Sequence, residues 1–273
     1  MKSIFSVQDQ VVVITGAGGA LAGSVARHLA SEGAVPVLLG RNLGKLETVL
    51  SDIRKANPKA PGLALSADVL DRKALESVRA RVLEEYGRID ALVNGAGGNM
   101  PGATISPEKT FFDLDPSAFR EVLDLNLTGT VLPTMVFGEP MSAASRGSIV
   151  NFSSVSATRA LTRVIGYSAA KSGVENFTRW LAVDLAKKSA GGIRVNAVMP
   201  GFFLGDQNRA LLTNPDGTLT DRGNTIVRQT PFGRFGEAAE LNGAFQYLLA
   251  PASSFVTGTV IVVDGGFSAF SGV

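Results

Sequence analysis

Short runs of apolar, mostly β-branched residues alternate along the chain with longer stretches in which apolar side chains recur every three or four positions. The first pattern predicts buried strands near residues 11–14, 35–39, 63–65, 89–93, 148–152, 193–198 and 259–263. The second predicts helices near residues 20–32, 43–56, 72–86, 116–144, 166–189 and 237–249. Continuous apolar strands separated by helices are typical of a parallel sheet that helices cover on both faces. We therefore expect an α/β fold with a doubly wound, seven-stranded parallel sheet.

One stretch departs from this alternation. Residues 202–232 separate the sixth predicted strand from the last helix and contain the turn signal Asn214-Pro215-Asp216-Gly217. An excursion of this length within a compact domain is usually functional or disordered. Its Phe, Leu and Arg side chains favour a lid over a substrate site. Because no repeat or low-complexity linker interrupts the rest, we expect residues 1–273 to form a single domain.

Composition excludes several classes of function. The 273 residues carry 26 Lys and Arg against 24 Asp and Glu, so a nucleic-acid-binding stripe is not expected. The absence of Cys excludes disulfides, zinc–thiolate sites, iron–sulfur clusters and thiol nucleophiles. One histidine, His28, argues against a Ser-His-Asp hydrolase and a multi-histidine metal site, and we expect no metal. No leader or membrane-length apolar run is present, so we expect a cytoplasmic protein without membrane contact.

A glycine-rich turn joins the first predicted strand to the first predicted helix. Its sequence runs Thr15-Gly16-Ala17-Gly18-Gly19-Ala20-Leu21. Glycines let backbone N–H groups approach a pyrophosphate at the start of a helix, where the helix dipole favours an anion. Tight packing of the turn is the alternative explanation. The position between a strand and a helix favours a dinucleotide site in a Rossmann-type sheet.

Four polar residues suggest the chemistry. Tyr167 and Lys171 lie four residues apart, on one face of a predicted helix, and Ser154 follows the fifth predicted strand. Asn126 lies within the predicted helix over 116–144. Reduction of a ketone by hydride leaves an alkoxide that needs a proton, which a phenol can donate if a nearby cation lowers its pKa from about 10. A serine hydroxyl can polarise the same oxygen by a hydrogen bond.

The turn and these four residues together resemble the short-chain dehydrogenase/reductase family, over residues 10–266. The resemblance implies that Asn126, Ser154, Tyr167 and Lys171 form the catalytic tetrad. Asn126 would hold a water, and Lys171 would also bind the nicotinamide ribose. Family members also usually assemble as tetramers. The helices over 116–144 and 166–189 are apolar on more than one face, which fits either subunit interfaces of a homotetramer or core.

Four positions depart from the family pattern. The usual motif Thr-Gly-x-x-x-Gly-x-Gly has alanines here, Ala20 and Ala22, at its last two glycines. The element Asn-Asn-Ala-Gly has Gly95 in place of its second Asn, and Gly205 stands where a Thr usually bonds the nicotinamide carboxamide. Alanine is the mildest replacement for glycine, so we expect the fold to be kept. Backbone groups of the residues before Gly205 can replace the threonine.

The resemblance places the cofactor-binding residues mainly at the ends of the predicted strands. They are Gly16, Gly18, Gly19, Ala20, Leu21, Arg41, Asp68, Val69, Asn94, Ala96, Gly97, Tyr167, Lys171, Pro200, Gly201 and Phe203. The second strand ends in Gly40-Arg41, without the carboxylate that binds the ribose 2′-hydroxyl of NAD. Because a guanidinium binds phosphate well, we favour NADP(H) as the cofactor. Arg41 could instead stack on adenine or lie in solvent, which leaves NAD(H) as the alternative.

Segments outside the general family pattern suggest the substrate. They are similar to the D-mannonate oxidoreductase (fructuronate reductase) branch and comprise residues 94–99, 111–115, 200–204, 207–212 and 264–273. The similarity implies that the substrate is the ketone of a sugar acid or the corresponding aldonate. Arginines suit a carboxylate and amides suit hydroxyl groups. The expected substrate-binding residues are therefore Asn99, Ser154, Arg163, Gln207, Asn208 and Arg209. Each arginine could equally be solvated or bridge subunits.

Two other functions remain open from the sequence. Phe202, Phe203 and Leu204 could line an apolar pocket, as a reductase for 3-oxoacyl thioesters, steroids or other carbonyl compounds would need. A scaffold that binds the nucleotide without turnover is the second alternative. The presence of Ser154, Tyr167 and Lys171 argues against such a scaffold.

Overall fold

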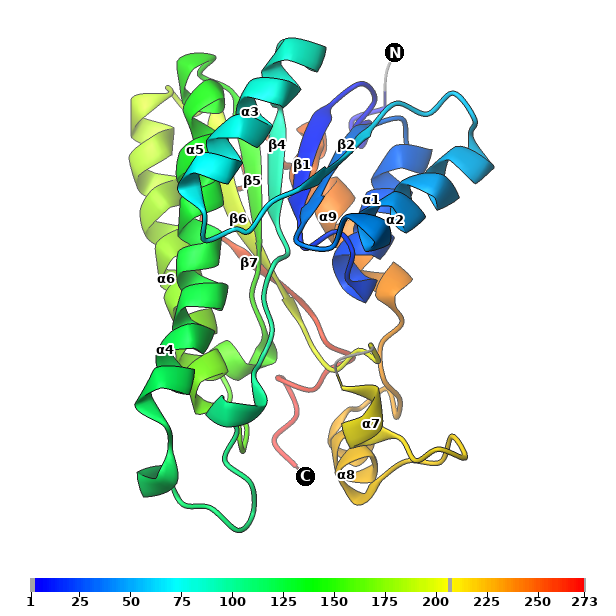
Figure 1. Cartoon of the computed structure of the whole chain (residues 1–273), viewed down its shortest axis with the longest axis vertical. Coiled ribbons are helices and arrows are strands. Elements are labelled where there is room, and N and C mark those ends of the chain that lie inside the picture. Colours follow the sequence, from blue (N-terminus) through cyan, green and yellow to red (C-terminus); the bar gives the residue numbers. More distant parts are fainter. Residues whose placement is uncertain (1–2, 206–207, 273) are drawn as a thin grey trace.

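The computed structural model of the chain describes residues 3–205 and 208–272 and contains one parallel sheet (Figure 1). Its strand order is β3-β2-β1-β4-β5-β6-β7, as expected for a doubly wound fold. The strands are β1 (Val11–Thr15), β2 (Val35–Gly40), β3 (Leu63–Ser66), β4 (Ala91–Asn94), β5 (Gly147–Phe152), β6 (Ile193–Pro200) and β7 (Val260–Val263). The order reverses between β1 and β4. In open α/β sheets, ligands bind beyond the carboxyl ends of the strands at such a reversal.

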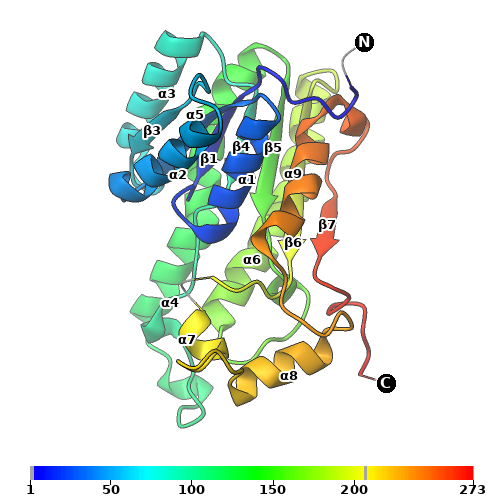
Figure 2. The same cartoon turned by 90° about the vertical axis from the view of Figure 1, so that its right-hand side faces the viewer.

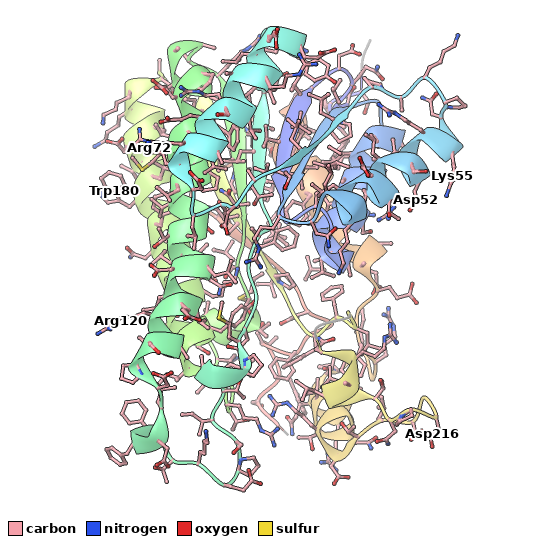
Figure 3. The ribbon with its side chains drawn as sticks, viewed as in Figure 1. Asp52, Lys55, Arg72, Arg120, Trp180 and Asp216 are labelled. Carbon is pink, nitrogen blue, oxygen red and sulfur yellow. The ribbon has the colours of Figure 1, made fainter. Side chains whose placement is uncertain are left out.

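Helices cover both faces of the sheet (Figures 1 and 2). One face carries α1 (Ala20–Ser31), α2 (Leu43–Ala56) and α9 (Asn242–Leu249). The other carries α3 (Arg72–Tyr86), α5 (Gly129–Ala143) and α6 (Ile165–Lys188), and α4 (Pro116–Leu123) precedes α5. Charged side chains such as Lys55 and Arg120 project from the helices to the outside (Figure 3). The predicted α/β fold with seven parallel strands is therefore confirmed.

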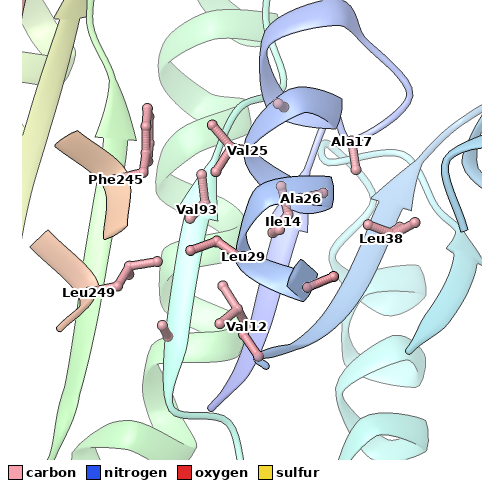
Figure 4. Packing of buried hydrophobic residues seen from close by; sticks show 14 of the residues in the cluster. Val12, Ile14, Ala17, Val25, Ala26, Leu29, Leu38, Val93, Phe245 and Leu249 are labelled. Carbon is pink, nitrogen blue, oxygen red and sulfur yellow. The ribbon is translucent and has the colours of Figure 1, made fainter. Parts of the chain in front are cut away.

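Successive residues of β1 belong to different cores. Val12 and Ile14 pack with Val25 and Leu29 of α1 on one face of the sheet (Figure 4). Val11 and Val13 belong to the core on the other face. All residues of β1 are buried, because side chains alternate between two covered faces. This explains why the strands read as uninterrupted apolar runs.

Local signals fix several helix ends. Asp115 accepts a hydrogen bond from the Ser117 backbone N–H at 2.8 Å, and Pro116 is the first residue of α4. Gly87 ends α3 with a φ of 69°, a conformation that glycine adopts at low cost. Short 3₁₀ helices cover Pro101–Ala103, Phe111–Asp113, Val155–Ala157, Ala238–Leu241 and Pro251–Ser253.

The predicted helix over 116–144 is present as a helical run from Pro116 to Ala143, but it is not regular throughout. A π-helical turn, Asp124–Thr128, separates α4 from α5. The Asn126 side chain donates to the Val122 backbone carbonyl at 2.8 Å, and this carbonyl is the one that the Asn126 N–H would bond in a regular α-helix. Within the π-helical turn, the Asn126 side chain thus donates to a backbone carbonyl of its own helix.

The excursion over 202–232 lies beyond the carboxyl ends of β6 and β7 (Figure 2). It contains two helices that the sequence analysis did not predict, α7 (Arg209–Leu212) and α8 (Asp221–Gln229). Thr220 caps α8 by accepting from the Gly223 N–H at 3.1 Å. The predicted helix over 237–249 begins as a 3₁₀ helix and continues as α9.

Candidate functional site

The glycine-rich turn is packed tightly against the loop after β4. Gly16 has a φ of 67°, and a Cβ atom on it would lie 2.5 Å from the Gly95 backbone oxygen. Gly19 precedes α1, and no side chain caps this helix or adds an acid to its first turn. The first N–H groups of α1 are therefore available to an anion, which the helix dipole also favours. These features fit the pyrophosphate of a dinucleotide.

The residues expected near the adenosine lie at the ends of β2 and β3. Arg41 is exposed, and its backbone carbonyl accepts from the Ser66 hydroxyl at 3.1 Å. Asp68 is partly exposed and accepts from the Leu70 N–H at 2.9 Å. Val69 is buried, and a Cβ on Gly129 would lie 2.9 Å from one of its methyl groups. Arg41 therefore presents its guanidinium to solvent beside the second strand.

Asn126 is locked to the loop after β4. Its side-chain oxygen accepts from the Gly98 N–H at 3.0 Å, and its side-chain nitrogen donates to the Gly98 carbonyl at 2.7 Å. A Cβ on Gly97 would lie 2.6 Å from the same side-chain oxygen and 3.5 Å from Lys171 Nζ. The absence of a side chain at Gly97 thus lets Asn126 and Lys171 approach the loop.

Asn94, the last residue of β4, has a buried side chain, unlike the residues of the loop that follows. Its side chain is 1% exposed and donates to Thr134 Oγ1 and Asn151 Oδ1, both at 2.9 Å. Asn151 in turn donates to Thr178 Oγ1 at 2.9 Å, which links β4 and β5 to α5 and α6. The Asn94 side chain therefore belongs to a buried polar network that joins two strands and two helices.

Ser154, Tyr167 and Lys171 lie together at the start of α6. The Tyr167 phenol lies close enough to the Ser154 hydroxyl for that hydroxyl to lower its pKa. Lys171 is 4% exposed, and its Nζ lies 5.5 Å from the centroid of the Tyr167 ring and donates to the Phe152 carbonyl at 2.8 Å. The structure thus brings together three of the four residues predicted to be catalytic. Asn126 lies near Lys171 as well, because both side chains lie next to Gly97.

The pKa values of this group are set mainly by burial. Burial raises the pKa of the Tyr167 phenol, and the hydrogen bond with Ser154 opposes this to a lesser degree. Burial lowers the pKa of Lys171 from 10.5 to about 8. In the protein without nucleotide, desolvation of the phenolate is therefore the largest effect on the pKa of Tyr167. Tyr167 is protonated at neutral pH and can donate a proton.

Glu175 is a buried acid that the sequence analysis did not single out. It is 3% exposed, accepts from the Ser153 hydroxyl at 2.7 Å and pairs with Arg179 at 2.9 Å. It lies one turn beyond Lys171 on α6, and Ser153 precedes Ser154. In the sequence, Glu175 could have been found from its spacing, because a residue four positions after Lys171 lies on the same face of the predicted helix. Glu175 therefore fixes the chain beside Ser154 to the helix that carries Tyr167.

The first part of the excursion lies near the glycine-rich turn. A Cβ on Gly205 would lie 3.7 Å from the Ala20 methyl group, and the Phe203 ring packs 2.5 Å from the corresponding position on Gly236. Asn208 donates to the Phe203 carbonyl at 2.8 Å and accepts from the Gly205 N–H at 2.9 Å. The Asn208 amide thus stabilises this turn, which leaves little of it for a substrate.

The other predicted substrate-binding residues are spread over three segments. Asn99 is exposed and donates to Thr104 Oγ1 at 2.8 Å. Arg163 is partly buried in the segment before α6, and Arg209 is exposed on α7. Gln207 lies outside the described residues. Arg159 lies in the same segment as Arg163, and it donates to the Ser268 carbonyl and so holds the C-terminal segment.

Two general features of the described residues bear on the function. Within 3–205 and 208–272, no group of three or more His, Cys, Asp or Glu side chains is arranged to hold a metal ion. Over the same ranges, no helix combines the length and apolar character needed to cross a membrane. The candidate site described above consists of the glycine-rich turn, the loop after β4, and the Ser154, Tyr167 and Lys171 group.

Comparisons with known proteins agree with this site. A family model described as enoyl-(acyl carrier protein) reductase matches residues 16–268. An uncharacterized oxidoreductase, UxuB, from Bacillus subtilis is 43% identical over 277 residues, which cover 98% of each chain. A cis-4-hydroxycyclohexanecarboxylate dehydrogenase from Sinomonas cyclohexanicum is 35% identical over 96% of this chain and 97% of its own.

A solved structure is also closely similar. The crystal structure of a candidate D-mannonate oxidoreductase from Haemophilus influenza, with bound NAD, superposes with a TM-score of 0.90. The two chains are 41% identical, and the match covers 99% of this chain and 100% of the other. The protein is an oxidoreductase that acts on CH–OH groups and their ketones with a nicotinamide nucleotide. It belongs to the short-chain dehydrogenase/reductase family.

Proposed function

We propose that this protein interconverts the ketone of a sugar acid and the corresponding aldonate, of the D-fructuronate and D-mannonate type. The observation that carries the reaction type is the grouping of Tyr167 and Ser154 beside the buried amine of Lys171. The similarity to a candidate D-mannonate oxidoreductase supports the substrate class. The carboxylate in the name of the Sinomonas relative's substrate supports an acidic substrate as well.

The residues of this chain have distinct roles in the proposed reaction. The nicotinamide, when bound, supplies the hydride for reduction or accepts it in oxidation. Ser154 donates a hydrogen bond to the substrate carbonyl oxygen, and Tyr167 donates its proton to the alkoxide. The resulting phenolate is stabilised by the Lys171 ammonium, which remains mostly charged at neutral pH with a pKa of about 8. Reduction therefore starts from the protonated phenol of Tyr167, and oxidation starts from its phenolate.

Asn126 has a more limited role in this proposal. Its side-chain amide is already bonded to Gly98 and Val122. A water in a proton relay would therefore bind its backbone carbonyl, which accepts from Thr130 Oγ1 at 2.8 Å and has a second lone pair. We propose that Asn126 chiefly holds the loop after β4 against Lys171.

The proposed nucleotide is NADP(H), on the basis of Arg41. Its exposed guanidinium at the end of β2 can bind a 2′-phosphate in a bidentate manner. The remaining cofactor contacts are proposed for the N-terminus of α1, for Asp68 and Val69, and for the segment from Pro200 to Phe203. NAD(H) is the alternative, and the similar Haemophilus structure holds NAD.

Residues 202–232 are proposed to act as a lid within a single domain. α7 and α8 lie beyond the carboxyl ends of the strands, where the Ser154, Tyr167 and Lys171 group also lies. Asn208, directly before α7, is anchored by its hydrogen bonds with Phe203 and Gly205, and Gly205 lies next to Ala20. Movement of α7 and α8 about this anchor would open and close the site.

A second candidate is the reduction of the ketone of a 3-oxoacyl thioester or another carbonyl compound. A cavity of about 80 Å³ is lined by Phe202, Phe203 and Phe232, and it could take an apolar chain. It also contains the ion pair of Arg234 with Glu240, at 2.7 Å, which is less suited to an acyl group. The sugar acid is therefore the preferred substrate class.

One panel of substrates tests the proposal. Oxidation of NADPH and NADH is followed with keto-uronates, neutral keto-sugars and acetoacyl thioesters. We expect the highest kcat/KM for a keto-uronate, by about tenfold or more over a neutral keto-sugar of the same length, because the carboxylate adds a charged contact. A higher kcat/KM for an acetoacyl thioester would select the second candidate. Binding of the nucleotide without turnover of any ketone would indicate a scaffold.

A further inference from the structure

An arginine on α8 reaches from the proposed lid to the body of the protein. Arg222 is partly buried, and its NH1 donates to Thr162 Oγ1 at 3.2 Å. Thr162 directly precedes Arg163, in the segment between β5 and α6. Arg222 was not singled out from the sequence. The contact joins residues 60 positions apart and places a second guanidinium beside a predicted substrate-binding arginine.

Arg163 is held in an unusual backbone conformation. Its φ is 78°, in the left-handed region that residues other than glycine rarely adopt. Its carbonyl accepts from the Ile105 N–H at 3.0 Å, which fixes it to the loop between β4 and α4. Conformations of this kind cost free energy and concentrate at ligand-binding and active sites.

Arg222 lies close to Arg163, because it contacts the residue directly before it, Thr162. Burial lowers the pKa of Arg222, and the charge of Arg163 lowers it further. Neither takes part in an ion pair within 3–205 and 208–272, although Arg163 is near enough to Glu108 to contribute to the lowered pKa of that carboxyl. Elsewhere on the same protein, Arg27 pairs with Asp52 at 2.8 Å. Two cations held together in this way repel each other until an anion binds between them.

Arg163 lies close to Tyr167 along the chain. Arg163 precedes Tyr167 by four residues, and α6 begins between them at Ile165. Their Cα atoms can therefore be at most about 14 Å apart, even if the chain between them were fully extended. A substrate of several carbons bound at the Tyr167 hydroxyl can therefore extend toward the chain segment that carries Arg163.

We propose that Arg222 and Arg163 together form an anion site that binds the carboxylate of the substrate, so that the bound acid links the lid to the body. The inference rests on the proposed function and specifies the residues that recognise the acid. Guanidinium groups bind carboxylates by two parallel hydrogen bonds, and a neutral hydroxymethyl group in the same place gains much less. The site would thus select sugar acids over neutral sugars.

The test measures binding without turnover. D-mannonate and the neutral D-mannitol are titrated by calorimetry into the enzyme saturated with reduced nucleotide, which cannot oxidise them. We expect Arg222→Ala and Arg163→Ala to raise the Kd of D-mannonate at least about tenfold, and Arg222→Lys to raise it less, because lysine keeps the charge without the fork. The Kd of D-mannitol should stay within about twofold, since a neutral ligand gains little from the pair.

Arg228→Ala provides the matched control, because Arg228 is exposed on the same helix. It should change neither Kd. The inference is overturned if Arg222→Ala leaves the Kd of D-mannonate unchanged, or if it weakens both ligands equally, which would indicate disruption of the fold. It is also overturned if D-mannonate binds the wild-type enzyme no better than D-mannitol. Failure of the proposed function is separate, since it appears as absent turnover of keto-uronates in the substrate panel.

Discussion

The methyl group of Ala22 lies 2.8 Å from the position that a Cβ atom on Gly95 would occupy. Each of the two residues departs from the family pattern, with Ala in place of a glycine and Gly in place of an asparagine. The methyl group at position 22 therefore fits because residue 95 has no side chain. The Gly95 N–H also donates to Thr15 Oγ1 at 3.1 Å, so β1, α1 and the loop after β4 form one packed unit. The two departures compensate each other sterically.

The first prediction concerns this pair. Gly95→Asn should lower the free energy of unfolding by about 1–3 kcal/mol, because the added Cβ overlaps Ala22. Addition of Ala22→Gly should restore part of this loss. The restoration is incomplete because the Thr15 backbone oxygen would still lie 2.7 Å from the new Cβ. Urea unfolding of both single variants and the double variant measures the coupling.

The ordinary cost of Ala22→Gly within a helix, about 1 kcal/mol, is the reference for the single variant. A double variant whose loss equals the sum of the two single losses would show that the two positions are independent. In that case the steric explanation for the altered motif would be wrong.

The second prediction tests proton donation by Tyr167. Tyr167→Phe should lower kcat at least ~10²-fold, because the alkoxide then has no positioned donor. The Kd of the reduced nucleotide should change little, since the ring is kept. Stopped-flow or steady-state assays with the best substrate of the panel measure the rate, and cofactor fluorescence measures binding.

Tyr86→Phe is the control for Tyr167→Phe, because Tyr86 lies at the end of α3, away from Ser154. It should retain the wild-type rate. An active Tyr167→Phe variant would remove Tyr167 from the proposed mechanism and leave water or another group as the proton donor.

Most of the fold could be predicted from the sequence because it depends on local patterns. The strand at Val11–Thr15 is apolar throughout and is buried on both faces, and Asp115-Pro116 marks the start of α4 without reference to the rest of the chain. The π-helical turn could not be predicted, because it depends on a bond from the Asn126 side chain to its own helix. α8 was missed because it is short and mostly polar.

The candidate site was predictable to a different extent. Tyr167 and Lys171 share a helical face because of their spacing, and the structure places them together. The burial of the Asn94 side chain depends on Thr134 and Asn151, which come from other elements. The contact of Arg222 with Thr162 likewise joins distant parts of the chain. Interactions between elements of this kind leave no periodic signal in a single sequence.

The third prediction follows from the lowered pKa of Lys171. The folded protein binds the Lys171 proton less tightly than the unfolded chain, so between pH 8 and 10.5 the unfolded chain holds more protons. The contribution of Lys171 to stability therefore rises with pH through that window. The free energy of unfolding of the wild type, relative to Lys171→Met, should rise by about 2 kcal/mol between pH 7 and pH 10.

Denaturant titrations of both proteins at several pH values give this difference without the nucleotide. Lys187→Met is the control, because Lys187 is exposed near the end of the same helix. Its difference from the wild type should stay constant with pH. A constant difference for Lys171→Met as well would mean that the buried amine keeps the pKa of the unfolded chain.

The fourth prediction concerns the choice between NADP(H) and NAD(H). Arg41→Ala should lower kcat/KM for NADPH at least about tenfold, because a charged contact to the 2′-phosphate is lost, and should change kcat/KM for NADH much less. Lys59→Ala provides a control for loss of a positive charge, since Lys59 is exposed in the loop before β3. A wild-type preference of about tenfold for NADH would overturn the proposal for NADP(H), and Arg41 would then stack on adenine or lie in solvent.

The fifth prediction concerns the proposed homotetramer. Trp180 and Val183 on α6 and Met135 on α5 are 64%, 57% and 51% exposed, and Figure 3 shows Trp180 projecting from the outer side of α6. Large exposed apolar side chains that gather on neighbouring helices indicate a surface that another chain covers. Light scattering of the wild type should therefore give about four times the chain mass of 28.4 kDa.

Trp180→Glu should reduce the assembly to dimers or monomers, because an unpaired carboxylate would be buried where the indole packs. Phe112→Glu is the matched control, since Phe112 is 91% exposed in the loop between β4 and α4 and lies outside the proposed interface. It should leave the mass unchanged. A wild-type mass of one chain would contradict the tetramer. A tetramer that survives Trp180→Glu would mean that α5 and α6 are not its interface, and another apolar surface would have to join the subunits.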